Sequence, residues 1–156
     1  MIGASVRVRA LRWGFRVLFG LPLPAKRALA GPPVRADGQL LDLDLQLLGR
    51  VTELLSSRDG GVVDQAAVAE QRRQADLAAE VSAPPGLDDV LTQDVEVPGA
   101  VRPLAARLYV PPSASSALLV YFHGGGFVLG SIASADPLCR LLAAQSGIRI
   151  LSVDYR

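Results

Sequence analysis

The sequence is poor in the residues that build metal clusters and covalent crosslinks. Its 156 residues include one cysteine and one histidine, and aromatic residues make up 5%. A single cysteine excludes an internal disulfide and a cysteine-based zinc cluster, so we expect no bound metal. Cys139 has apolar neighbours and is predicted to be a buried structural thiol, with a reactive thiol as the alternative. So few cysteines fit a reducing, cytoplasmic location.

Long apolar runs are also missing. No stretch of about 18 apolar residues is present, which argues against a membrane-spanning helix. Half of the residues are apolar and a fifth are charged, which is the composition of a globular protein. Ala28-Leu29-Ala30 resembles a signal-peptide cleavage site, but Lys26-Arg27 lies where that region should be uncharged, so we expect no cleaved signal.

Acidic residues are absent from residues 1–35, although seven basic side chains lie there. Residues 5–19 show helical spacing of apolar side chains with arginines on another face. This helix packs as part of a cap or, alternatively, contacts a membrane surface. The basic residues are not interleaved with aromatic ones, so no nucleic-acid partner is expected. Prolines then predict a linker, and residues 1–36 form a first region.

The rest of the chain divides into a helical region, residues 37–86, and an extended region, residues 87–156. Helical patterns cover residues 40–57 and 64–81. In the extended region, residues 91–97 and 104–110 predict an antiparallel hairpin. We expect the two helices to cover another surface, because neither carries a cluster of convergent polar groups.

A βαβ unit closes the sequence. Residues 118–122 and 148–153 are apolar runs of strand length on either side of a helical pattern at residues 133–146. Such runs are typical of parallel strands buried on both faces. The fold class is therefore α/β, with helices followed by four strands of a mostly parallel sheet and one crossover helix.

The turn between the first apolar strand and its helix contains His123-Gly124-Gly125-Gly126. Consecutive glycines permit backbone angles that are forbidden to other residues and bring backbone N–H groups close to a ligand. Several N–H groups directed at one point are what a tetrahedral acyl intermediate needs for its negative oxygen. A purely structural glycine-rich turn is the alternative interpretation.

Phosphate and dinucleotide loops fit this turn poorly. A phosphate loop needs Lys and then Ser or Thr after its last glycine, whereas Gly130 is followed by Ser131-Ile132. A dinucleotide fingerprint that begins at Gly124 needs glycine at position 129, which is Leu129. We therefore expect no cofactor.

The run from His123 to Ser131, followed by Val153-Asp154-Tyr155-Arg156 after the next strand, resembles the hormone-sensitive-lipase-like esterases of the α/β-hydrolase fold. The helical residues before the sheet are similar to that family's cap. The resemblance covers nearly the whole chain but only the first half of the family's domain. It implies a carboxylic-ester hydrolase that acts through a serine acyl-enzyme on short- to medium-chain acyl esters.

The resemblance also implies a role for each matched residue. The amides of Gly125 and Gly126 would be the oxyanion donors, while His123 and Gly124 would support the loop. Support from the neighbouring strand end would come from three further residues: Asp154, Tyr155 and Arg156.

The family's nucleophile lies in a Gly-x-Ser-x-Gly motif, and no such motif occurs in these residues. The only histidine, His123, already belongs to the loop. We therefore expect the N-terminal part of an esterase that is inactive alone. The alternative is a non-catalytic remnant or an interaction module that pairs through an open sheet edge.

Overall fold

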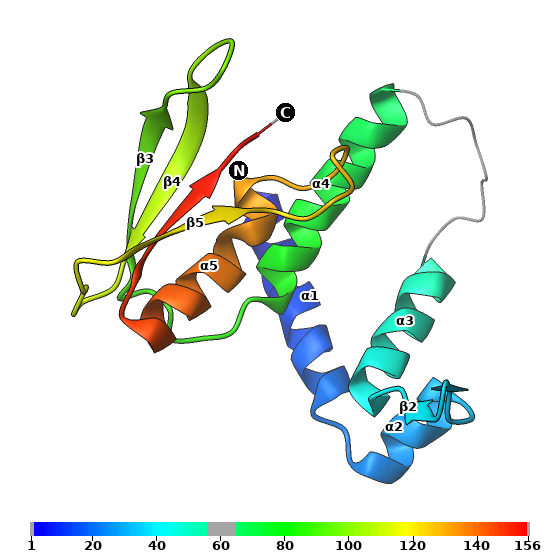
Figure 1. Ribbon diagram of the computed structural model, residues 1–156. Helices are drawn as coiled ribbons and strands as arrows, with labels where there is room; N and C mark the ends of the chain where they lie inside the picture. The colour runs from blue at the N-terminus through cyan, green and yellow to red at the C-terminus, as the bar shows by residue number, and fades with distance from the viewer. Residues whose placement is uncertain (1, 56–64, 156) are drawn as a thin grey trace. The chain divides into compact units, whose positions relative to one another are not determined.

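The computed structural model describes residues 2–55 and 65–155, and it divides into two compact units, residues 1–62 and 63–156 (Figure 1). In its described residues, the first unit contains three helices and a short hairpin, and the second contains two helices and a four-stranded sheet. The first unit has these elements: α1 (Ile2–Phe19), α2 (Leu23–Ala30), β1 (Arg35–Ala36), β2 (Gln39–Leu40) and α3 (Leu43–Leu55). The second has these: α4 (Gln65–Ser82), β3 (Leu91–Val97), β4 (Leu104–Val110), β5 (Leu118–Phe122), α5 (Ile132–Ser146) and β6 (Arg149–Val153).

Helix α2 lies where the prolines predicted only a linker. Its first turn contains Pro24, and proline is tolerated there because the first N–H groups of a helix have no partner within the helix. The helix packs on α3, where Leu47 is buried. Beside Leu47, the Gln46 side chain donates to the carbonyls of Ala30 (2.9 Å) and Pro32 (2.8 Å). This amide fixes the chain that leaves α2, so the linker expectation was wrong for these residues.

Helix α3 begins three residues later than expected, after the β1–β2 hairpin. The side chain of Asp42 accepts hydrogen bonds from the backbone N–H groups of Asp44 (2.9 Å) and Leu45 (3.2 Å). These N–H groups of the first helical turn have no acceptor within the helix, so Asp42 acts as its N-cap. The expected end of this helix at Ser57 and the expected start of the next helix at Asp64 lie outside the described residues.

The sheet of the second unit has the strand order β3-β4-β6-β5, with β6 (red in Figure 1) between β4 and β5. The expected hairpin β3–β4 is confirmed as antiparallel, and so is the expected parallel pair β5–β6. The pair β4–β6 is antiparallel. The described strands therefore form a mixed sheet, because the hairpin joins the βαβ unit in antiparallel fashion, and "mostly parallel" does not fit these four strands.

Helix α5 covers one face of the sheet and also contacts α4. The core between α5 and the sheet includes Tyr109 and Ile150 from the strands and Cys139 from the helix. The expected burial of Cys139 is therefore confirmed. Burial raises the pKa of its thiol to about 11.

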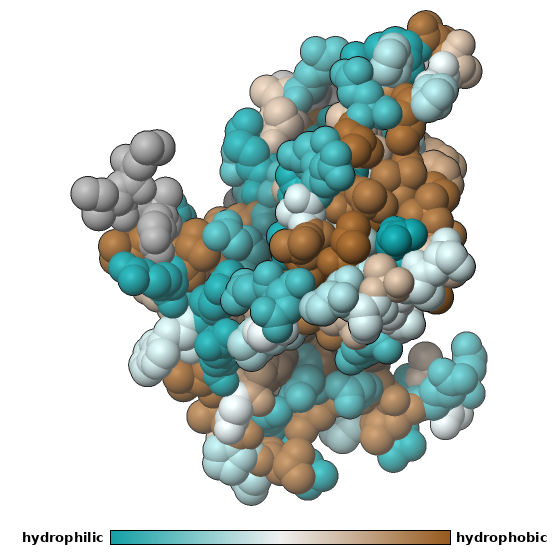
Figure 2. Space-filling model, turned by 90° about the vertical axis from the view of Figure 1, so that its left-hand side faces the viewer, coloured by the Kyte–Doolittle hydropathy of each residue, from teal (hydrophilic) through white to brown (hydrophobic). Residues whose placement is uncertain are grey.

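Strand β5 was expected to be buried on both faces, and the structure contradicts this. Tyr121 packs against the core, whereas the other four residues of the strand are exposed. The reason is position: β5 lies at the edge of the sheet, and α5 covers only one face. Figure 2, which faces the left-hand side of Figure 1, shows exposed apolar side chains gathered in patches on the surface.

Candidate functional site

The glycine-rich loop joins the end of β5 to the start of α5. Ser131 caps α5: its hydroxyl accepts from the N–H of Ser134 at 2.9 Å, and the Ser134 hydroxyl accepts from the N–H of Ser131 at 2.9 Å. This reciprocal capping box satisfies N–H groups that the first helical turn leaves without partners. The last residue of the loop is therefore fixed in place by the helix that follows it.

A tight turn forms the centre of the loop. The N–H groups of Val128 and Leu129 both donate to the Gly125 carbonyl, at 3.1 and 2.8 Å. Gly125, Gly126 and Phe127 have φ angles of 132°, 60° and 63°. Three consecutive residues thus have positive φ angles, which the two glycines adopt readily. Only Phe127, which has a side chain, is strained by such an angle.

Gly125 is required by close packing as well as by its φ angle. A Cβ atom at this position would lie 2.0 Å from the Leu129 carbonyl oxygen and 2.4 Å from its carbon. Both are backbone atoms of the same turn, so no side chain fits unless the loop changes shape.

The glycines border an open hollow of about 390 Å³ on the molecular surface. Its lining consists of the loop glycines, neighbouring aromatic side chains and the histidine: Phe122, His123, Gly124, Gly125, Gly126, Phe127 and Tyr155. Among the hydrogen bonds of the described residues, none uses the N–H of Gly125 or Gly126 as a donor. These two N–H groups therefore lie beside the hollow without an intramolecular partner in the described part of the chain.

His123 is buried at the base of the loop, with 6% of its surface exposed. Its Nδ1 lies 3.0 Å from the Gly124 carbonyl oxygen, which assigns the ring proton to Nδ1. Its Nε2 lies 3.9 Å from Asp154 Oδ1, beyond hydrogen-bond distance. Gly130 packs against the ring so closely that a Cβ there would lie 2.3 Å from Nδ1.

Tyr155 contacts the histidine in two ways. Its hydroxyl donates to the His123 carbonyl, and the two rings stack with centroids 4.4 Å apart and planes 21° apart. Asp154 precedes it at the end of β6, where the Asp154 N–H donates to the Ala105 carbonyl at 2.9 Å. The structure thus brings His123, Asp154 and Tyr155 together, while Arg156 lies outside the described residues.

Two residues of α4 contact the loop, and the sequence patterns did not identify them. Arg72 donates through Nε (2.8 Å) and Nη2 (2.5 Å) to the Val128 carbonyl, and Asp76 accepts from the Ser131 hydroxyl at 2.5 Å. The sequence held one local signal of these contacts: Arg72 and Asp76 are four residues apart, which places both side chains on one face of the helix. Their partners lie more than 50 positions away, so no local pattern relates the two segments.

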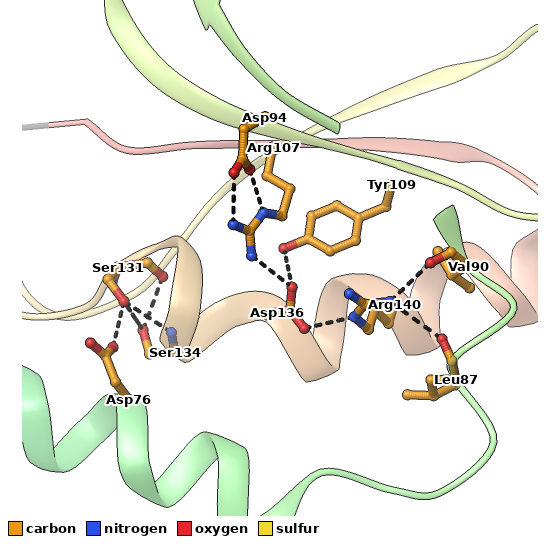
Figure 3. A network of polar contacts seen from close by, with 10 residues as sticks. All are labelled: Asp76, Leu87, Val90, Asp94, Arg107, Tyr109, Ser131, Ser134, Asp136 and Arg140. Carbon is orange, nitrogen blue, oxygen red and sulfur yellow. Dashed lines mark hydrogen bonds and ion pairs between the residues drawn. The ribbon is translucent and has the colours of Figure 1, made fainter. Parts of the chain in front are cut away.

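A separate polar network lies between α5 and the sheet (Figure 3). Asp136 accepts hydrogen bonds from Arg107 (3.2 Å), Tyr109 (3.0 Å) and Arg140 (2.7 Å). Burial raises the pKa of Tyr109, and the nearby Asp136 carboxylate raises it further. Arg140 extends the network by donating to the Val90 carbonyl at 2.9 Å. The network joins α5 to β4 and to the chain before β3, so it holds the helix that begins at the loop.

Among the described residues, no group of three or more His, Cys, Asp and Glu side chains is arranged to hold a metal ion. Nor does the described part of the chain contain a helix with the length and apolar character needed to cross a bilayer.

The chain is similar in sequence to known proteins. Residues 119–156 match the α/β hydrolase fold family. LipN of Mycobacterium tuberculosis, a carboxylic ester hydrolase, is 38% identical over 145 residues, which cover 92% of this chain and 38% of that protein. An acetyl esterase of Salmonella schwarzengrund is 41% identical over 64 residues, or 41% of this chain and 20% of that protein.

Solved esterase structures are also similar. A Pyrobaculum calidifontis esterase aligns with a TM-score of 0.53 and 33% identity, covering 70% of this chain and 34% of that one. An esterase of the bacterial hormone-sensitive lipase family aligns with a TM-score of 0.53 and 28% identity, covering 70% and 34%. The chain therefore spans well under half the length of each of these relatives.

Proposed function

The chain belongs to the hormone-sensitive-lipase-like esterase family of the α/β-hydrolase fold, and from this premise we propose that it is the part of a carboxylic-ester hydrolase that carries the oxyanion hole. The N–H groups of Gly125 and Gly126 are the proposed donors. His123, Gly124, Asp154 and Tyr155 are the proposed supports of the loop.

The observation that carries this proposal is the shape of the turn at Gly125. Its backbone angle and the neighbouring Leu129 carbonyl admit only glycine, and the turn borders the hollow of about 390 Å³. A backbone of this shape brings N–H groups to an open surface where an ester carbonyl has room. Donors held in place before the reaction stabilise developing charge without reorganising, and one such donor contributes about 3–4 kcal/mol.

In the proposed mechanism the substrate's carbonyl oxygen lies in the hollow, in front of the two glycine N–H groups. Their hydrogen bonds strengthen as a serine oxygen attacks the carbonyl carbon and negative charge moves onto the carbonyl oxygen. His123 takes no part as a base, because its ring is buried, stacks on Tyr155 and points Nδ1 at the Gly124 carbonyl. Its role is to hold the loop.

We propose that these 156 residues alone hydrolyse no ester above background. They contain no Gly-x-Ser-x-Gly motif, and their only histidine is occupied in the loop. A serine hydroxyl without a neighbouring base is a weak nucleophile. The nucleophile, the acid and the base would come from a further segment of polypeptide.

A chimeric enzyme tests this proposal. The segment of LipN that matches this chain would be replaced by the chain's own residues, and hydrolysis of 4-nitrophenyl acetate and butyrate would be measured. We expect the chimera to be active, the 156-residue chain to be inactive, and Gly125→Ala in the chimera to lower kcat by about 100-fold or more. A folded but inactive chimera, or turnover by the chain alone that Gly125→Ala abolishes, would refute it.

The names of the relatives support a substrate class. An acetyl esterase and a versiconal hemiacetal acetate esterase of Aspergillus parasiticus, 39% identical over 82 residues, are both named for acetate esters. We therefore propose short- to medium-chain acyl esters as substrates. Activity that rises steadily from acetate to palmitate esters would contradict this choice.

A second candidate function, an interaction module, is favoured by the edge strand β5. Exposed apolar side chains include Leu118, Val120 and Phe122, with exposed fractions of 53%, 47% and 62%. An apolar strand at a sheet edge is prone to pair with another chain. Gel filtration separates the two functions: a stable, soluble monomer favours an independent module, and an aggregating product favours part of an enzyme.

Contact with a membrane surface through residues 5–19 is a third proposal. Trp13 of α1 is 71% exposed, and the helix carries arginines such as Arg9 and Arg16. Apolar and basic side chains on one helix favour anionic lipid surfaces. Binding to vesicles that contain phosphatidylserine should be lost on deletion of residues 1–20. Equal binding by the deletion variant would refute this proposal.

A further inference from the structure

We propose that helix α4 positions the oxyanion loop through a two-point clasp, formed by Arg72 and Asp76. The inference rests on the proposed function of the loop and deepens it. It assigns a positioning role to two side chains that belong to a different element from the loop and lie more than 45 positions before it in the sequence.

The first point of the clasp holds the glycine turn. Two nitrogens of the Arg72 guanidinium donate to the Val128 carbonyl at 2.8 and 2.5 Å, and the N–H of Val128 donates to the Gly125 carbonyl at 3.1 Å. Val128 therefore links α4 to Gly125, whose amide is a proposed oxyanion donor.

The second point holds the end of the loop (Figure 3). Asp76 accepts from the Ser131 hydroxyl at 2.5 Å, and the same hydroxyl accepts from the N–H of Ser134 at 2.9 Å. A hydrogen bond to a carboxylate is stronger than one between neutral groups. The cap of α5 is therefore connected to α4 at the residue where the loop ends.

The two points lie on either side of Gly130, which packs against the His123 ring. His123 and Tyr155 hold the beginning of the loop from the sheet side, and the clasp holds its end from α4. Three successive left-handed residues lie between these supports. Because glycine has many backbone conformations open to it, a turn that contains two glycines depends on outside contacts for its shape. Removal of the clasp should therefore loosen the turn while the sheet stays intact.

The neighbouring Arg73 provides a matched control. It pairs with Glu70 on the same helix at 2.5 Å, an ordinary exposed pair between residues three positions apart. Arg72 instead directs its donors at a backbone carbonyl of the loop. Replacing either arginine removes the same charge from the same helix, but only one replacement removes a contact with the loop.

Amide hydrogen exchange, followed by NMR on the whole 156-residue chain, tests the clasp without any need for activity. In Arg72→Ala we expect the N–H groups of Val128 and Leu129 to exchange about five- to tenfold faster, the effect of losing one hydrogen bond. The N–H of Leu151, inside the sheet, should keep its rate. Arg73→Ala should leave all three rates unchanged.

Two further variants complete the test. Asp76→Ala should accelerate the N–H of Ser134 by a similar factor. Arg72→Lys keeps one donor for the carbonyl and should give intermediate rates; if Arg72→Ala does not fold, this variant decides the question. Unchanged loop rates, a uniform increase that includes Leu151, or an equal effect of Arg73→Ala would each overturn the proposal.

The same variants in the LipN chimera separate this inference from the proposed function. With 4-nitrophenyl butyrate, Arg72→Ala should lower kcat about five- to tenfold with little change in KM, because loosened donors act mainly in the transition state. Arg72→Lys should restore part of the loss, and an equal change in KM would count against a positioning role. An inactive parent chimera would refute the esterase proposal, whereas the exchange rates would still decide the clasp.

Discussion

Replacement of Gly125 by alanine should destabilise the loop more than any similar change beside it. The φ angle of 132° is strained for any residue with a Cβ, and the new methyl group would lie 2.0 Å from the Leu129 carbonyl oxygen. Strain of this kind costs about 1–3 kcal/mol. Relief of the clash breaks the hydrogen bond from Leu129, which costs about 1 kcal/mol more. We therefore expect a loss of about 2–4 kcal/mol in the free energy of unfolding.

The two neighbouring glycines give matched controls for this experiment. A Cβ on Gly124 meets no atom within 4 Å, and its φ angle lies outside the strained range, so Gly124→Ala should change stability by less than about 0.5 kcal/mol. Gly126 has a φ angle of 60° but open space around it, so Gly126→Ala should cost about 1 kcal/mol.

Urea denaturation of the three variants, followed by circular dichroism, measures the series. The expected order of destabilisation is Gly124→Ala, then Gly126→Ala, then Gly125→Ala. If Gly125→Ala unfolds at the same urea concentration as Gly124→Ala, the backbone of the loop differs from the one described, and the argument that only glycine fits there fails.

Three further predictions concern the surroundings of the loop. In Gly130→Ala the methyl group would lie 2.3 Å from both the Gly124 carbonyl oxygen and His123 Nδ1, so the loop backbone and the ring must both move. We expect a loss of about 2 kcal/mol in the free energy of unfolding, measured in urea, and an unchanged midpoint would count against this packing. Asp136→Ala leaves the buried Tyr109 hydroxyl without its acceptor and should cost about 2–4 kcal/mol by the same assay, so a loss well below this would argue against the network. Because burial raises the pKa of Cys139 to about 11, its contribution to stability is complete below about pH 8.5 and is lost as the pH rises towards 11. The decline in stability over that pH range should be smaller in Cys139→Ala, and an unchanged decline would contradict this assignment.

The strands were predictable because their signals are local. Alternation of apolar and polar residues at the end of residues 91–97, followed by the turn residues Pro98-Gly99, predicted residues 91–97 and 104–110 as a hairpin, and the structure has the same bounds. The parallel pairing of β5 and β6 followed from strand, crossover helix and strand in succession.

Burial of β5 was predicted wrongly. An apolar run shows that a strand is suited to burial on both faces, but it does not show which other strands and helices cover those faces. Helix α2 was missed because the prolines were interpreted as helix breakers. Pro24 lies in the first turn of the helix, where proline is tolerated.

The site was predictable in part for the same reasons. The glycine run and its family resemblance identified the loop, and the structure brings His123 and Tyr155 together as a stacked pair. The donor role of Gly125 and Gly126 stays a prediction. Arg72 and Asp76 were missed because their contacts depend on tertiary packing of α4 beside the loop.

The central claim is that Gly125 and Gly126 direct their N–H groups at an acyl oxygen, and a trapped tetrahedral adduct tests it most directly. The active chimera would be inhibited with an organophosphate that esterifies the nucleophilic serine, and its crystal structure determined. We predict that the phosphoryl oxygen lies about 2.7–3.1 Å from the backbone nitrogens of both glycines. An oxygen bound elsewhere, or glycine N–H groups paired with other backbone carbonyls, would contradict the claim.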